Sequence, residues 1–165
     1  MKTTLSFAVL ILIYVSGCVS KGYIPEPSYD TKDPKITRLM FFLGKSRKSS
    51  LFKKFMNKYR LIQKKFGQEG KYYPRDYAYT YWYKKDKIVK LVIAVHRPVA
   101  RKGFGIYTGA LPYGLYRRDT HQTVMNKLGK PDSSILDKSI LVYNKKHLQI
   151  TFIDNILSTV TITAE

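Results

Sequence analysis

The sequence predicts an α+β fold of two similar units, each with a helix packed on a small antiparallel β-sheet. The main observation is an internal resemblance. Met56-Asn57-Lys58 recurs as Met125-Asn126-Lys127, and the strand-turn-strand pattern of 79–95 recurs at 148–164, an offset of 68 or 69 residues. In both copies a helical pattern precedes strand patterns. The chain is also 44% hydrophobic and has 165 residues, enough for one domain or two small ones.

Four segments follow from this reading. We expect an export signal at 1–17, a tether at 18–34, a first α+β unit at 35–102 and a second at 103–165. Pro25, Pro27 and Pro34 oppose helix in the tether and favour extended backbone.

Helical spacing predicts the first helix. Its apolar stripe consists of Leu51, Phe52, Phe55, Met56, Tyr59, Ile62 and Phe66. Ser49 or Ser50 is expected to cap its start, and Gly67 to end it.

The second helix is expected to begin at Asp119, which forms a pair of the capping-box type with Gln122. Its apolar side consists of Val124, Met125 and Leu128, and Gly129 and Pro131 are expected to stop it.

Alternating and β-branched residues predict the strands. Tyr79, Tyr81 and Tyr83 alternate with Thr80 and Trp82 before a turn at 84–87 and a strand at 88–95. The second unit has strand patterns at 140–143, 148–153 and 157–163. We expect the tyrosine face to pack beneath the helix, which leaves Thr80, Trp82 and Lys84 on the open face of the sheet.

The N-terminus predicts export. Lys2 precedes an apolar run from Leu5 to Val15, which is too short to span a bilayer. The run ends in Val15-Ser16-Gly17-Cys18, which resembles the lipobox of bacterial lipoproteins, and Cys18 is the only cysteine. The resemblance implies a chain anchored by acyl groups, palmitate among them, at Cys18. Val19 after the cysteine then implies the outer membrane, facing the periplasm, in a Gram-negative host. The alternative is an ordinary secretory signal.

A second resemblance lies between Gly114 and Pro131. Val124-x-x-x-Leu128-Gly129-x-Pro131 after a capped helix start resembles the BamE outer-membrane assembly lipoproteins. The tandem arrangement is similar to the β-lactamase inhibitor protein fold. Both resemblances imply short helices on one face of an antiparallel sheet, and they report fold rather than activity.

Positive charge is concentrated in the first unit. The chain carries a formal net charge of +19. Residues 35–102 hold 20 Lys and Arg against three acids, whereas 103–165 hold seven against five. Such a surface attracts anionic partners. The candidate partner-binding residues are Lys53, Lys54, Lys58, Arg60, Lys64, Lys65, Trp82, Lys84, Lys85 and Lys87.

No constellation of catalytic or metal-ligating residues stands out. His96, His121 and His147 are isolated from one another and from the cysteine, and the carboxylates fall mostly at turns or caps. We therefore expect no enzyme, no metal and no cofactor. Export also makes nucleic acid an improbable partner, although tyrosines beside lysines can stack bases.

The sequence thus predicts a non-enzymatic, lipid-anchored envelope protein that binds and inhibits a partner, as immunity proteins do. The expected partner is an acidic protein. The alternative is an outer-membrane assembly or scaffold lipoprotein whose lysines contact anionic lipid or lipopolysaccharide.

Overall fold

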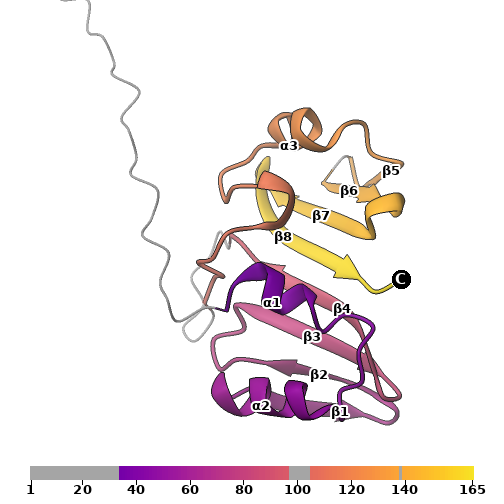
Figure 1. The fold of residues 1–165 in the computed structure, drawn as a ribbon. Coiled ribbons are helices and arrows are strands. Elements are labelled where there is room, and N and C mark those ends of the chain that lie inside the picture. The colour runs from indigo at the N-terminus through magenta and orange to yellow at the C-terminus, as the bar shows by residue number, and fades with distance from the viewer. Residues whose placement is uncertain (1–33, 97–104, 138) are drawn as a thin grey trace, which may run out of the picture.

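The computed structural model describes residues 34–96, 105–137 and 139–165. The expected signal, Cys18 and the tether up to residue 33 lie outside the described residues. The described chain forms one eight-stranded sheet in the order β1-β2-β3-β4-β8-β7-β6-β5, and every pairing is antiparallel (Figure 1).

The helices are few and short. They are α1 (Ile36–Met40), α2 (Ser50–Lys58), α3 (His121–Leu128) and the 3₁₀ turns η1 (Pro112–Gly114) and η2 (Asn144–Lys146). The strands are β1 (Ile62–Phe66), β2 (Glu69–Tyr73), β3 (Tyr79–Lys84), β4 (Lys87–Ala94), β5 (Ser133–Ile135), β6 (Ile140–Tyr143), β7 (Leu148–Ile153) and β8 (Ile156–Thr163).

The predicted fold class is wrong: the chain does not form two helix-plus-small-sheet units. Strands hold 38% of the described residues and helices 23%. The two expected small sheets merge because β4 pairs with β8 at five positions, from Lys90 opposite Thr163 to Ala94 opposite Thr159. Each strand thereby gains a hydrogen-bonded neighbour that an isolated unit would lack.

The same order of elements nevertheless occurs twice within this sheet. One helix and four strands run from α2 to β4, and one helix and four strands run from α3 to β8. The register shift between Trp82 and Tyr83 in β3 recurs between Thr151 and Phe152 in β7, 69 residues later. An offset of 69 also relates the buried Leu91 to the buried Val160. Under the offset of 68, Val160 would instead match Val92, which lies on the opposite face.

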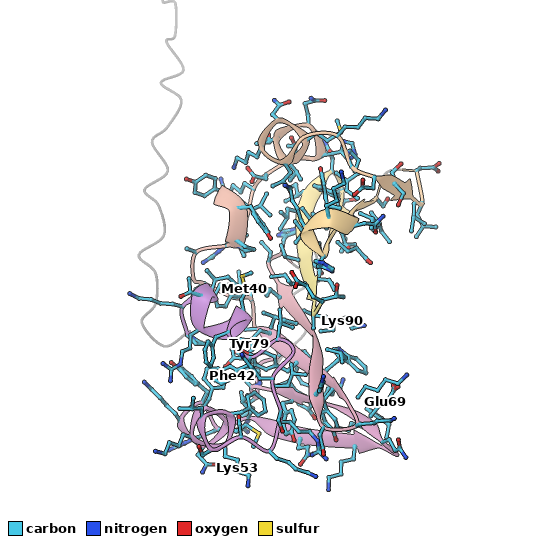
Figure 2. The ribbon with its side chains drawn as sticks, turned by 45° about the vertical axis from the view of Figure 1, so that its right-hand side comes forward. Met40, Phe42, Lys53, Glu69, Tyr79 and Lys90 are labelled. Atoms are coloured by element: carbon cyan, nitrogen blue, oxygen red, sulfur yellow. The ribbon has the colours of Figure 1, made fainter. Side chains whose placement is uncertain are left out.

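All three α-helices lie on one side of the sheet, as both views indicate (Figures 1 and 2). Directly paired residues of a sheet point to the same side. The buried pairs Tyr81–Leu91, Leu91–Ile162 and Ile162–Leu148 therefore place one continuous apolar face against the helices.

Aromatic rings fill the core beneath α1 and α2. Phe42, Phe52 and Phe55 surround Tyr81, with ring centroids 5.6–6.3 Å from it. The Tyr81 hydroxyl donates to the Leu39 carbonyl at 2.9 Å. Burial raises the pKa of Tyr81 well above its usual value, which keeps the phenol neutral. The tyrosine face of β3 thus packs beneath the helices, as its alternation predicts.

The first helix ends earlier than its apolar stripe predicts. Ser49 caps α2 by accepting from the Phe52 amide, but the helix stops at Lys58 and Arg60 adopts a φ of 49°. Residues 62–66 form β1 instead. Gly67, with a φ of 60°, begins the turn to β2 rather than ending a helix.

The start of the second helix also differs by one residue. Thr120, not Asp119, caps α3 and accepts from the Thr123 amide. Asp119 is buried, and both of its carboxylate oxygens lie 2.8 Å from the Lys127 ammonium. At the other end Gly129 has a φ of 86° and donates to Met125, so the Gly129-x-Pro131 segment ends the helix as expected.

The β4–β8 pairing predicts that both halves unfold together. Ile93→Ala removes a fully buried side chain opposite Val160 and should cost about 2–4 kcal/mol. In urea, Trp82 fluorescence reports the first half and amide exchange in β7 reports the second. Both transitions should move to lower urea by the same amount.

The matched control is Val92→Ala, the next position of β4, which lies on the open face opposite Thr161. Its loss of stability should be clearly smaller. Unchanged exchange protection in β7 of Ile93→Ala would show that the halves fold independently.

Candidate functional site

The face of the sheet opposite the helices is the candidate functional site. Trp82 lies directly between Lys71 of β2 and Lys90 of β4 in the strand register. Figure 2 shows Lys90 pointing away from α1 and α2, whereas Phe42 and Tyr79 lie between those helices and the sheet. Strand pairing thus collects basic and aromatic residues from separate strands on one surface.

Five residues form a compact cluster there, which we call the sheet patch: Lys71, Tyr73, Tyr77, Trp82 and Lys90. The Lys71 ammonium lies 5.2 Å from the centroid of the Tyr73 ring and 5.6 Å from those of Tyr77 and Trp82. The Lys90 ammonium lies 5.1 Å from the Trp82 centroid. These separations are in the range of cation–π attraction, so the ammonium groups are held beside the rings.

The two tyrosines of the sheet patch support each other. The Tyr73 and Tyr77 rings stack with centroids 4.2 Å apart and planes 12° apart. A hydrogen bond with Tyr77 raises the pKa of the Tyr73 hydroxyl. The stacking restricts the motion of both rings, and Tyr73 is buried beneath Tyr77 and Lys71. A ligand that contacts Tyr77 therefore loses little side-chain entropy on binding.

A shallow hollow of about 290 Å³ adjoins the sheet patch on the same face. Its lining residues are Tyr77, Thr80, Val92, Ala94, His96, Ile153, Ser158 and Thr159. The Ser158 hydroxyl donates to the His96 carbonyl at 2.9 Å and joins the ends of β4 and β8. The hollow combines methyl groups with hydroxyls, and it has room for a side chain of a partner next to the charged cluster.

Charge divides this sheet sharply. Strands β1–β4 contain six lysines and one acid, Glu69, whereas strands β5–β8 contain no charged residue. Glu69 pairs with Lys84 at 3.3 Å and offsets only one of the six lysines. The open face is therefore basic and aromatic at one end and neutral and threonine-rich at the other.

The structure separates the predicted binding residues into four places. Lys53, Lys54 and Lys58 lie on α2, and Arg60 follows it, on the helix side. Lys64 and Lys65 lie on the edge strand β1, where Lys64 is opposite Lys71. Trp82 belongs to the sheet patch.

The remaining three predicted residues, Lys84, Lys85 and Lys87, lie at the β3–β4 turn. Sequence reasoning missed Lys71, Tyr73, Tyr77 and Lys90, although the same alternation that placed Trp82 on the open face could have found Lys90.

Arg47 holds the β3–β4 turn in place from the helix side. Its guanidinium donates to the Lys85 carbonyl at 3.0 Å and lies 4.5 Å from the centroid of the Tyr83 ring. It also pairs with Asp86 at 3.5 Å, and Lys48 reaches the same carboxylate at 2.8 Å.

Tyr83 can lie across β2 only because residue 70 is glycine: a β-carbon there would collide with the Tyr83 phenol. These contacts fix the position of β3, which carries Trp82, relative to β2 and the β3–β4 turn.

Other site chemistry is sparse in the described ranges. His96, His121 and His147 lie apart, and no group of three or more His, Cys, Asp or Glu side chains among the described residues could hold a metal ion. None of the helices in these ranges has the length and hydropathy to span a membrane.

Comparison of the chain with known proteins gives no match. No family model matches the chain, and neither curated proteins nor solved structures give a significant match.

The Asp86 ion pairs predict a pH effect. The hydrogen bond from Lys48 lowers the pKa of Asp86, and Arg47 adds to this. A lowered pKa contributes stability that is present above the unfolded value, near 3.8, and is lost as the pH falls through the folded value. At pH 7 and low salt, Asp86→Asn should therefore have a lower Tm than the parent chain, and the difference should shrink below pH 4.

Asp137→Asn, at an exposed aspartate in the second half, is the matched control and should leave the Tm unchanged at both pH values. Salt at 1 M should also reduce the Asp86 effect, because the pair is exposed. A difference between Asp86→Asn and the parent that stayed constant down to pH 2 would contradict the ion-pair account.

Proposed function

We propose that this chain is a non-enzymatic, lipid-anchored protein of the cell envelope that binds an acidic protein partner through the sheet patch and blocks that partner's activity. The observation that carries the proposal is Trp82, which is flanked on both sides by lysines on an open sheet face. Tryptophan next to pre-ordered tyrosines and positive charge is the composition of an interface hot spot.

The arrangement of the lysines favours a protein over stacked nucleobases. A nucleobase needs a free ring face on which to stack. The ammonium groups of Lys71 and Lys90, on the two strands beside β3, already lie next to the Trp82 ring. Carboxylates of a protein partner can pair with these ammonium groups while the ring supplies apolar contact. Such a mixture of aromatic area and charge suits a protein surface.

The charge division of the sheet supports an acidic partner. Six lysines lie on the half that carries the sheet patch and none on the strands of the other half. Complementary potentials raise the rate of association and suppress partners of the wrong sign. The lipid anchor at Cys18 remains a proposal from the lipobox resemblance, and it would keep the protein at the membrane surface.

Site-specific cross-linking in cells of the native organism tests the proposal. A photoreactive residue replaces Thr80, beside the sheet patch, or Lys53, on α2. We expect a protein adduct from position 80, and we expect Trp82→Ala to abolish it. With the purified partner, Trp82→Ala should weaken binding about 10- to 30-fold.

The charge contribution has its own readout. Lys71→Ala with Lys90→Ala should slow association and flatten its salt dependence. Lys53→Ala, on the opposite side of the molecule, is the control and should change neither. An adduct that forms at position 53 instead of 80, or that survives Trp82→Ala, would contradict the proposal.

A further inference from the structure

A second surface, on the helix side, carries a different chemistry. A groove of about 590 Å³ lies between α1 and α2. Phe42 and Phe55 form part of its floor, and both also belong to the core. Phe41 and Leu51 line it as well, yet they are 50% and 52% exposed. A helix face that only meets water carries mainly polar side chains. Two large apolar side chains that are half-exposed beside one groove therefore indicate an interaction surface.

The rim of this groove is cationic. Lys35, Arg38, Lys54 and Lys58 line it, and no acidic residue does. Among the described residues, no Asp or Glu lies within ion-pair distance of these four cations. The long side chains keep their charges in water while their stems extend the apolar floor.

The surrounding sequence adds to this charge. Residues 45–65 hold nine basic residues and no acid, and Lys45 lies 5.8 Å from the centroid of the exposed Phe41 ring.

We propose that this groove, with its exposed Phe41 and Leu51, docks on the surface of an anionic phospholipid bilayer. The apolar side chains enter the boundary between headgroups and acyl chains, and the four cations bind lipid phosphates. Apolar area combined with several Lys and Arg residues is the pattern that binds anionic membranes, where each basic residue contributes about 1 kcal/mol. A protein partner would need an apolar patch beside its carboxylates to cover Phe41 and Leu51, whereas every anionic bilayer offers both chemistries side by side.

The place where the described chain begins supports a membrane occupant. Lys35 lines the groove and is the second described residue, and the carbonyl of Pro34 accepts from the buried Tyr107 hydroxyl at 2.7 Å. The chain therefore enters the fold at the groove. Sixteen residues lie between Cys18 and Lys35, and a chain of this length can span at most about 60 Å. An anchor at Cys18 would hold this face near the bilayer.

Docking by the groove leaves the sheet patch free, because the two surfaces lie on opposite sides of the sheet. The inference shares the lipid anchor with the proposed function but not the protein-binding site, so membrane docking and protein binding can each fail without the other. Together they describe a molecule that holds its helix side to the membrane and presents its open sheet face to the aqueous space.

Vesicle binding tests the groove directly. Residues 19–165 contain every described helix and strand and lack the cysteine. We expect them to sediment with vesicles of phosphatidylglycerol and phosphatidylcholine, but not with phosphatidylcholine alone. Lys54→Glu with Lys58→Glu should lower the partition coefficient tenfold or more, since each charge contributes about 1 kcal/mol. Phe41→Ser with Leu51→Ser should lower it at constant charge.

Lys84→Glu with Lys85→Glu is the matched control, with the same change in net charge at the β3–β4 turn. It should retain binding within about threefold, because neither lysine lines the groove and salt weakens the attraction of charges that do not contact the bilayer. Equal losses in the two pairs of variants would overturn the proposal in favour of diffuse attraction. So would equal binding to both kinds of vesicle, or no effect of Phe41→Ser with Leu51→Ser. Thermal unfolding confirms that each variant is folded.

The single tryptophan reports which face meets the bilayer. Brominated acyl chains quench tryptophan that lies near them. Trp82 in the parent sequence should be unquenched, whereas Leu51→Trp in a Trp82→Phe background should be quenched. Strong quenching of Trp82 would place the sheet face on the membrane and overturn the proposal.

Discussion

The antiparallel pairing of β4 with β8 is the interaction on which the rest of the structure depends. It joins two four-stranded halves at their inner edges, from Lys90 opposite Thr163 to Ala94 opposite Thr159. Because paired residues point to the same side, it also aligns the buried faces of both halves into one core. The helices cover this face, and the opposite face is left as one surface. The hollow beside the sheet patch follows from this pairing, because residues of both β4 and β8 line it.

The two halves repeat the same order of elements and the same register shift 69 residues apart, yet their surfaces differ. In β3 and β7 the burial pattern is identical, with every second residue in the core. The outward-facing residues of the two strands differ: Trp82 of β3 corresponds to Thr151 of β7 at this offset. A repeated backbone thus tolerates different outward side chains, because core packing constrains only the inward positions.

Local signals explain what the sequence predicted correctly and where it misled. The alternation in β3 placed Tyr79, Tyr81 and Tyr83 inside because one face of a strand must be buried. The error at 60–66 has a physical cause as well. Ile62 and Phe66 are four residues apart, which suits a helical stripe, but every residue of β1 is exposed and the strand is held by backbone pairing with β2. A strand that buries neither face needs no alternation of apolar and polar residues, so its sequence carries no strand pattern.

The sequence by itself determined the excess of positive charge in the first half, the ends of several elements and the outward direction of Trp82. These depend on composition, turn residues and short periods, which act within a few positions of the chain. Only the tertiary structure decided that two halves share one sheet, that Lys71 and Lys90 flank Trp82, and that α1 and α2 enclose a cationic groove. Each of these joins residues from separate elements, and strand order and register arise from the packing of the whole chain.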